Sequence, residues 1–279
     1  MISIVRVELL RLADWRRWWF VLVPLVATAW VVSDELVSRA INHDYVVNAW
    51  DLPLEMVNNV FIFAFVLVPL ASLVLGQVAL TDRIDGFVAL TLPRTESKAR
   101  WWVSKLVAMG AASVVFFAAA FLMAVIVGWV ATDRLGWSLS PYGAATPDSY
   151  GSPLEAARYF GPPPLAGLWA PVRVAAVYLY SAIATWNLIA CCVLPTARWP
   201  KAWIPIASTI GVVGVFWQVT PTNLLHPLVH LLWDYHTFSV YNVAVSWWGS
   251  ALFMGGELLL AVGGGIFLFR RSDILRSVT

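Results

Sequence analysis

Hydrophobic residues are gathered into long runs along this chain, and polar residues mark the segments between them. Five runs hold no charged residue and the last holds one; they cover residues 18–32, 57–80, 106–131, 174–195, 202–220 and 247–269. A helix needs roughly 20 apolar residues to cross a hydrocarbon core of about 30 Å, so only the first run is short. The pattern predicts an all-α membrane protein with six transmembrane helices in a single domain, residues 1–279.

Charge between the runs indicates which segments face the cytoplasm. Fourteen of the 18 Lys and Arg residues lie before the first run, between the second and third, after the fourth, or at the end of the chain. Cytoplasmic segments retain Lys and Arg during insertion, so both termini are expected in the cytoplasm. Many of the 17 tryptophans lie near the ends of the runs, which predicts an aromatic belt at the membrane surface. They include Trp15, Trp18, Trp19, Trp101, Trp102, Trp199, Trp203, Trp247 and Trp248.

The remaining segments predict four further features. Residues 2–17 are amphipathic and predict an interfacial helix, with an N-terminal extension of the first span as the alternative. Residues 132–171 are rich in Gly and Pro and form an external loop. Residues 221–246 are apolar but interrupted, which predicts a re-entrant or surface helical hairpin between spans five and six. Residues 81–100 form a cytoplasmic loop.

That cytoplasmic loop carries a pattern of its own. Thr81 can cap a short helix whose first turn contains Asp82 and Asp85, where the helix dipole favours carboxylates. The helix has to end before Pro93. Its apolar side favours docking to a soluble partner. That side consists of Ile84, Val88 and Leu92.

The order of residues in this loop resembles the cytoplasmic loop of ABC-2 type transporter permeases. The matching residues are Asp82 or Asp85, Gly86, Leu90, Leu92, Pro93, Arg94 and Lys105. The surface helix, the six spans and the long external segments also resemble that family. The sequence departs from the usual family pattern at Phe87, where Thr is common, and after Pro93, where a Ser-Arg pair is common. A plain basic loop in another six-span protein is the alternative.

The resemblance implies the membrane-spanning permease subunit of a prokaryotic ABC exporter in the plasma membrane. It implies a second copy of this chain, or a related permease, and separate ATPase subunits that bind ATP and Mg. The ATPase-coupling residues would be Asp82, Arg83, Asp85, Gly86, Leu90, Leu92, Pro93, Arg94 and Lys105. The chain itself has no phosphate-binding loop, zinc-protease motif or nucleophile elbow, so no catalysis or bound cofactor is expected. Its net charge of +2 is explained by topology, and no nucleic acid partner is expected.

Glu257 is the one charged residue inside a predicted span. A charge near the middle of the bilayer costs about 2.5–3.5 kcal/mol on insertion scales, so such residues face a protein interior or a wet cavity. We expect Glu257 to line a substrate pathway with Asn187 and Gln77. One alternative is a structural role, in which Glu257 is hydrogen-bonded to Asn187 or Gln77. Another is a proton-coupled secondary transporter in which Glu257 titrates.

A weaker pattern lies in the external segment 221–246. His226, His230 and Asp234 recur at four-residue steps and would share one face of a helix. Imidazole and carboxylate groups can bind Zn²⁺ or Cu²⁺. Histidine is also an ordinary residue at polar interfaces, and we expect no metal here.

Overall fold

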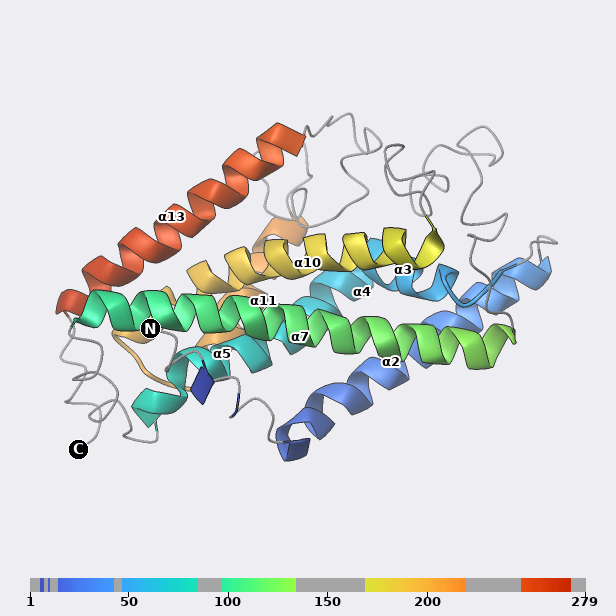
Figure 1. Ribbon diagram of the computed structural model, residues 1–279, viewed down its shortest axis with the longest axis horizontal. Helices are drawn as coiled ribbons and strands as arrows, with labels where there is room; N and C mark the ends of the chain where they lie inside the picture. Colours follow the sequence, from blue (N-terminus) through green and yellow to red (C-terminus); the bar gives the residue numbers. More distant parts are fainter. Residues whose placement is uncertain are drawn as a thin grey trace.

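The computed structural model describes residues 6, 7, 10, 15–42, 47–84, 97–133, 169–218 and 247–271. Within these ranges the chain is helical and contains no strand (Figure 1). The helices are α2 (Trp15–Asn42), α3 (Asp51–Asn58), α4 (Val60–Ile62), the π-helix η1 (Phe63–Leu67), α5 (Val68–Ile84), α7 (Lys98–Thr132), α10 (Ala170–Cys192), the 3₁₀-helix η5 (Leu194–Ala197), α11 (Ile204–Gln218) and α13 (Trp247–Arg271). The predicted all-helical class is therefore confirmed for the described part of the chain.

In the described part of the chain, five helices are long and apolar enough to cross a membrane: Trp18–Asn42, Phe63–Ile84, Lys98–Thr132, Ala170–Cys192 and Trp248–Arg271. The predicted span 202–220 corresponds to α11, which has 15 residues. At 1.5 Å per residue α11 is about 22 Å long, shorter than a hydrocarbon core of about 30 Å. Residues 219–246, which include the predicted hairpin, lie outside the described residues. A sixth crossing and the hairpin stay predictions.

Helix α7 is the centre of the molecule, because α2, α3, α5, α10 and α13 all pack against it. It begins where the Ser97 hydroxyl accepts a hydrogen bond of 3.2 Å from the backbone N–H of Arg100, as expected for an N-cap. It ends at Asp133, whose backbone is left-handed with φ 50° and whose N–H donates to the carbonyl of Trp129. Buried alanines along α7 let the neighbouring helices approach closely. They are Ala108, Ala112, Ala120 and Ala124.

The second predicted span is built from α4, η1 and α5 in succession. Its start is capped by Asn59, whose side-chain oxygen accepts from the N–H groups of Phe61 and Ile62 at 3.1 and 3.2 Å. In η1 the N–H of Val68 bonds to the carbonyl of Phe63, five residues back. The following residue, Pro69, has no N–H to donate to the preceding turn. The π-helical turn therefore lies just before the residue that interrupts the α-helical hydrogen-bond pattern.

Helix α3 is an element that the hydrophobic pattern does not predict, because it precedes the second run. Residues 51–57 are all buried, and the helix packs between α2, α7 and α10. Asp51 accepts a 2.7 Å hydrogen bond from the N–H of Asn48 at the start of α3. The hydroxyl of Tyr178 in α10 donates to the carbonyl of Pro53 at 3.2 Å. The N-cap of α3 is Trp50, whose side chain makes no capping hydrogen bond, so the start of this helix lacks the usual polar signal in the sequence.

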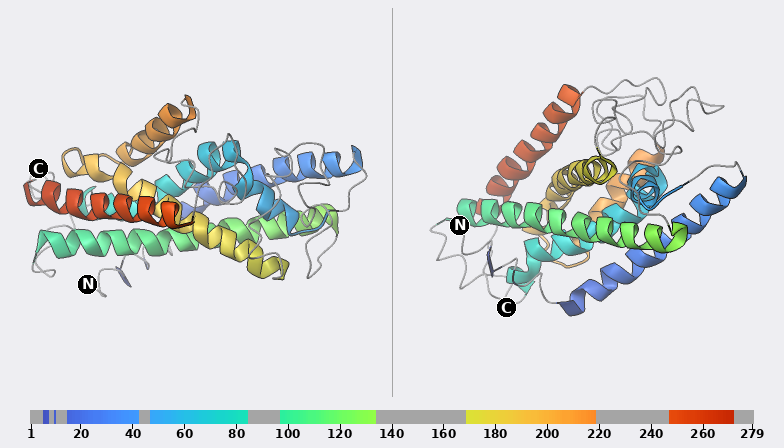
Figure 2. Two further views of the ribbon diagram at one scale, coloured as in Figure 1. Left: turned by 90° about the horizontal axis from the view of Figure 1, so that it is seen from above. Right: turned by 45° about the vertical axis from the view of Figure 1, so that its right-hand side comes forward.

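Helix α13 diverges from α7 toward its N-terminal end in Figure 1 and in the right-hand view of Figure 2. Side-chain hydrogen bonds join α13 to α7 at the carbonyls of Ala261 and Arg270. They join it to α10 at the carbonyl of Glu257 and at the side chain of Ser250, which pairs with Tyr180. Toward its C-terminus, Phe269 is buried against the bundle. The N-terminal half of α13 therefore lies away from α7, which leaves room for a cavity.

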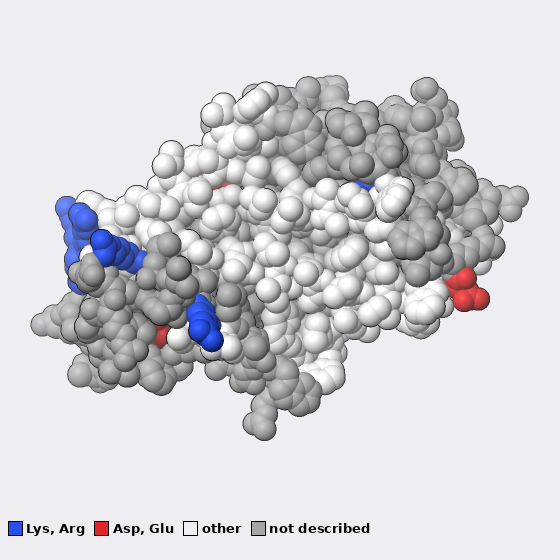
Figure 3. All heavy atoms as spheres, viewed as in Figure 1, with Lys and Arg blue, Asp and Glu red and all other residues white. Residues whose placement is uncertain are grey.

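Charged side chains are divided between the two ends of the described structure. Figure 3 shows Lys and Arg mostly on the end where α7 begins and α13 ends, and exposed acidic side chains at the opposite end. At the basic end the Lys98 ammonium donates to the carbonyl of Arg270 at 3.5 Å. This division is compatible with the multi-pass arrangement that the positive-inside rule predicts.

Candidate functional site

The first candidate site lies where α5 ends and α7 begins. Asp82 of α5 and Lys105 of α7 form an ion pair with a Nζ–Oδ2 distance of 2.9 Å, and both side chains are fully buried. The Lys105 ammonium also donates to the carbonyl of Val78 at 3.1 Å and lies 5.8 Å from the centre of the Trp101 ring. Removing one partner of such a pair would leave a buried, uncompensated charge. The pair therefore connects α5 to α7 in the interior of the helix bundle.

Arg83, the next residue, connects α5 to two other elements. Its guanidinium donates to the carbonyls of Thr196 and Ala197 in η5, the second at 3.4 Å. It also lies 5.5 Å from the centre of the Phe269 ring of α13. Arg83 is buried, so it satisfies the carbonyl groups of η5 in place of water. We refer to Asp82, Arg83, Lys105 and Phe269 as the loop-end cluster.

The course of α5 corrects one prediction about this region. A new helix capped by Thr81 is wrong, because α5 continues to Ile84 and the Thr81 hydroxyl donates to the carbonyl of Gln77 at 2.6 Å. Helices α5 and α7 extend beyond the apolar runs because an ion pair in the interior, Asp82 with Lys105, lets both helices include charged residues. Asp82, Arg83 and Lys105 consequently face the bundle interior. Their role in coupling to an ATPase stays a prediction. The other predicted coupling residues, Asp85, Gly86, Leu90, Leu92, Pro93 and Arg94, lie outside the described residues.

Trp101 and Trp102 belong to the same region and are fully buried, so their assignment to a membrane-surface belt is wrong. The Trp102 indole N–H donates to the carbonyl of Ala261 in α13 at 2.9 Å, and its ring stacks on Phe269 with centroids 4.6 Å apart. Gly265 makes this contact possible, because a Cβ there would overlap the Trp102 ring. Other tryptophans of the proposed belt are exposed: Trp19, Trp199, Trp203 and Trp248.

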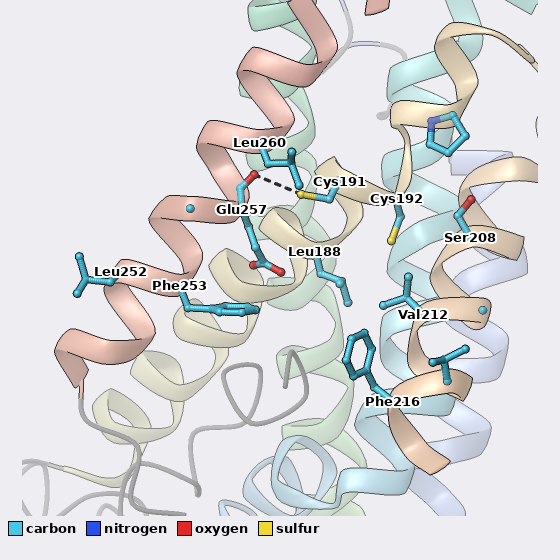
Figure 4. Close-up of a pocket in the computed structure, with 14 residues that line it drawn as sticks. Leu188, Cys191, Cys192, Ser208, Val212, Phe216, Leu252, Phe253, Glu257 and Leu260 are labelled. Atoms are coloured by element: carbon cyan, nitrogen blue, oxygen red, sulfur yellow. Dashed lines mark hydrogen bonds between the residues drawn. The ribbon is translucent and has the colours of Figure 1, made fainter. Parts of the chain in front are cut away.

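The second candidate site surrounds Glu257. A cavity of about 920 Å³ lies between α10, α11 and α13, and Glu257 is the one charged residue among the 14 that line it. Figure 4 shows the Glu257 carboxylate extending from α13 into this space, with Phe253 on the same face of the helix. Phe216 of α11 faces them across the cavity, and Leu188 of α10 lies between (Figure 4). The remaining lining is largely aliphatic, so the cavity is an apolar volume with one acidic group.

Glu257 also takes part in the contact between α13 and α10. The Cys191 thiol donates to the backbone carbonyl of Glu257 at 3.2 Å, which leaves the carboxylate directed into the cavity (Figure 4). The two partners suggested by sequence have other contacts: the Asn187 amide donates to the carbonyl of Ile183 in its own helix, and the Gln77 side chain is exposed on α5. Among the described residues, no hydrogen bond joins either of them to Glu257.

Buried charges also lie at the opposite end of the bundle, where sequence analysis proposed no site. Asp51 and Glu55 of α3 and Arg173 of α10 are each no more than 5% exposed. Their signal in the sequence was weak, because they lie outside the apolar runs and resemble ordinary loop residues. They become interior residues only because α3 packs against α10.

The weak candidates for metal binding belong to the segment 221–246. His226, His230 and Asp234 lie outside the described residues. Within the part of the chain that the structure describes, no group of three or more His, Cys, Asp or Glu side chains is placed to hold a metal ion.

Comparisons with protein-family models, with curated proteins and with solved structures found no match to this chain. The function of this chain is therefore inferred from the two sites themselves and from the residue pattern of the loop between α5 and α7.

Proposed function

We propose that this chain is the membrane-spanning permease subunit of an ABC exporter in a prokaryotic plasma membrane. In this proposal both termini face the cytoplasm, a second copy or a related permease completes the membrane part, and separate ATPase subunits bind ATP and Mg. The sequence of the loop 81–100, which resembles that of ABC-2 type permeases, motivates the proposal.

The observation that carries the proposal is the loop-end cluster. The loop from residue 85 to residue 96 leaves α5 next to Asp82 and Arg83 and enters α7 one turn before Arg100. A force on this loop would act on α5 and α7 together, because separating Asp82 from Lys105 exposes two buried charges to an apolar interior. Arg83 extends the connection to η5 and to Phe269 of α13.

This connection also reaches the cavity. Phe269 and Glu257 lie on the same helix, so a displacement of α13 at its C-terminal end would move one wall of the cavity. A soluble ATPase docked on the loop could thereby shift the permease between inward- and outward-open states by a rigid-body movement. Interior packing favours such two-state movements over gradual deformation.

The proposal is tested by purifying the chain gently from its native membrane and identifying the bound soluble proteins by mass spectrometry. A stoichiometric ATPase subunit is the expected result. The double substitution Asp85→Arg with Gly86→Trp should release that subunit while leaving membrane insertion intact. Asp34→Arg is a matched charge-reversal control on α2, at an exposed position outside the loop, and should retain the ATPase.

Two outcomes would contradict the proposal, one its docking loop and the other its ABC function. Retention of the ATPase by the double variant would remove the loop from the docking surface. Absence of any ATPase from the purified wild-type chain would remove the ABC function itself. A proton-coupled carrier would then be favoured by the position of Glu257, as the one charged residue in the described lining of the cavity. Uptake driven by a pH gradient, and its loss in Glu257→Gln, would test that second function.

A further inference from the structure

The cavity beside Glu257 opens on the perimeter of the helix bundle. Residues at its rim are apolar and exposed: Val215 of α11 is 63% exposed, and Leu252 and Leu260 of α13 are 77% and 59% exposed. In a protein whose helices cross a bilayer, such a perimeter faces hydrocarbon. A molecule dissolved in the membrane could therefore enter between α11 and α13 without crossing a polar surface.

The carboxylate of Glu257 limits which class of molecule could bind in the cavity. Glu257 is the one charged residue in the lining, and the described lining supplies no Lys or Arg to neutralise it. A lipid acyl chain in this position would leave a carboxylate in an apolar volume without a counter-charge, which is costly. An occupant with a positive charge would compensate it. A carboxylate and a cation separated by a few ångströms attract strongly where water is scarce.

The aromatic residues favour a cation with a large apolar body. Phe253 lies one helical turn before Glu257, and Phe216 faces it from α11 (Figure 4). Aromatic faces attract cations, most of all those with weak hydration. The volume of about 920 Å³ is at the upper end of the range for sites of small organic ligands, roughly 300–1,000 Å³.

We propose that this cavity binds a lipophilic cation, a molecule with one positive charge on a bulky apolar body, which enters from the bilayer. The carboxylate of Glu257 pairs with the charge, and Phe253, Phe216 and the aliphatic walls hold the body. This inference names the substrate class of the proposed permease and rests on that function only for transport. Binding itself requires the permease chain alone.

The experiment measures equilibrium binding to the full-length chain in nanodiscs of phosphatidylcholine, without an ATPase. Tetraphenylphosphonium is the probe, and tetraphenylborate is a probe of nearly the same shape and opposite charge. We expect saturable binding of the phosphonium and none of the borate. Glu257→Gln should weaken phosphonium binding by about tenfold or more, because it removes the counter-charge and keeps the side-chain volume.

A second pair of variants tests the location independently of charge. Gly211 and Gly214 both lie on α11, and a Cβ added at either has no neighbouring atom within 4 Å. Gly211 lines the cavity and Gly214 does not. Gly211→Phe should fill the site and abolish phosphonium binding, whereas Gly214→Phe should bind like the wild type. At neither position does the first side-chain carbon meet another atom, and thermal unfolding of both variants checks that they are folded.

Three results would overturn the inference. They are equal affinity of the wild type and folded Glu257→Gln for the phosphonium, no saturable binding by the wild type, and unchanged binding by Gly211→Phe. A change of oligomeric state in Gly211→Phe without a change in binding would assign the face to a second copy of the chain. Co-purification of the ATPase is a separate measurement. A failure to bind the phosphonium would therefore not contradict the permease function, and absence of the ATPase would not contradict cation binding.

Discussion

At the residue scale, the absence of a side chain at Gly265 allows α13 to meet α7. A methyl group there would overlap the Trp102 ring, whereas one at Gly263 would meet no atom within 4 Å. Gly265→Ala should therefore lower stability by about 1–3 kcal/mol through overpacking. Gly263→Ala should leave stability unchanged or raise it by about 1 kcal/mol, because alanine favours the helix. Thermal unfolding of the two purified variants measures the difference, and equal midpoints would contradict the close approach at Gly265.

A second prediction concerns the buried ion pair of Asp82 and Lys105. Asp82→Asn or Lys105→Met alone leaves one buried charge and should destabilise the protein by about 3–5 kcal/mol. The double variant Asp82→Asn with Lys105→Met buries no charge, so it should recover a large part of that loss. A double-mutant cycle of unfolding free energies in detergent measures the coupling. Additive losses would mean that the two groups do not stabilise each other.

Two helical segments in this protein begin where a polar side chain accepts hydrogen bonds from the backbone, at Asn59 and at Ser97. The second spanning segment starts at Asn59, whose side chain accepts from two backbone N–H groups. Asn59→Ala should cost about 1 kcal/mol, and Asn59→Asp, which keeps the acceptor, should cost much less. Hydrogen exchange of the amides at residues 61 and 62 is the readout. Unchanged protection in Asn59→Ala would show that Asn59 does not cap this helix.

The boundaries of other elements were only partly predictable. The apolar runs located α7 and α13, but charged residues were taken as the limits of the spans, and the structure carries α5 through Asp82 and Arg83. Their burial depends on partners far along the chain, Lys105 and Thr196. Helix α3 was missed for a similar reason, since its two carboxylates are interior groups only in the folded bundle. Hydropathy measures the residues of one segment and contains no information about such partners.

The charge division between the two ends of the whole molecule predicts its orientation. In a background where Cys191 and Cys192 are replaced by Ser and Ala, a cysteine at the exposed residue Asn42 should react with a membrane-impermeant maleimide on intact cells. A cysteine at the exposed residue Lys201 should react only after permeabilisation. This follows because Lys201 belongs to a basic segment, and such segments stay in the cytoplasm. The reverse labelling pattern would invert the topology.

The residue pattern is sufficient to predict that this chain is helical and has several segments of membrane-spanning length. In hydrocarbon every backbone polar group has to be satisfied within the segment, so long apolar runs form helices whatever their neighbours. It also marked Glu257 as unusual, because an isolated charge in an apolar run is costly anywhere in the bilayer. Tertiary structure alone decided that Glu257 shares a cavity with Phe216 of α11 and that Asp82 and Lys105 are buried together. Those contacts join residues that are distant in the chain. They are stabilised by packing and ion pairing, which cannot be read from the hydrophobicity of one segment.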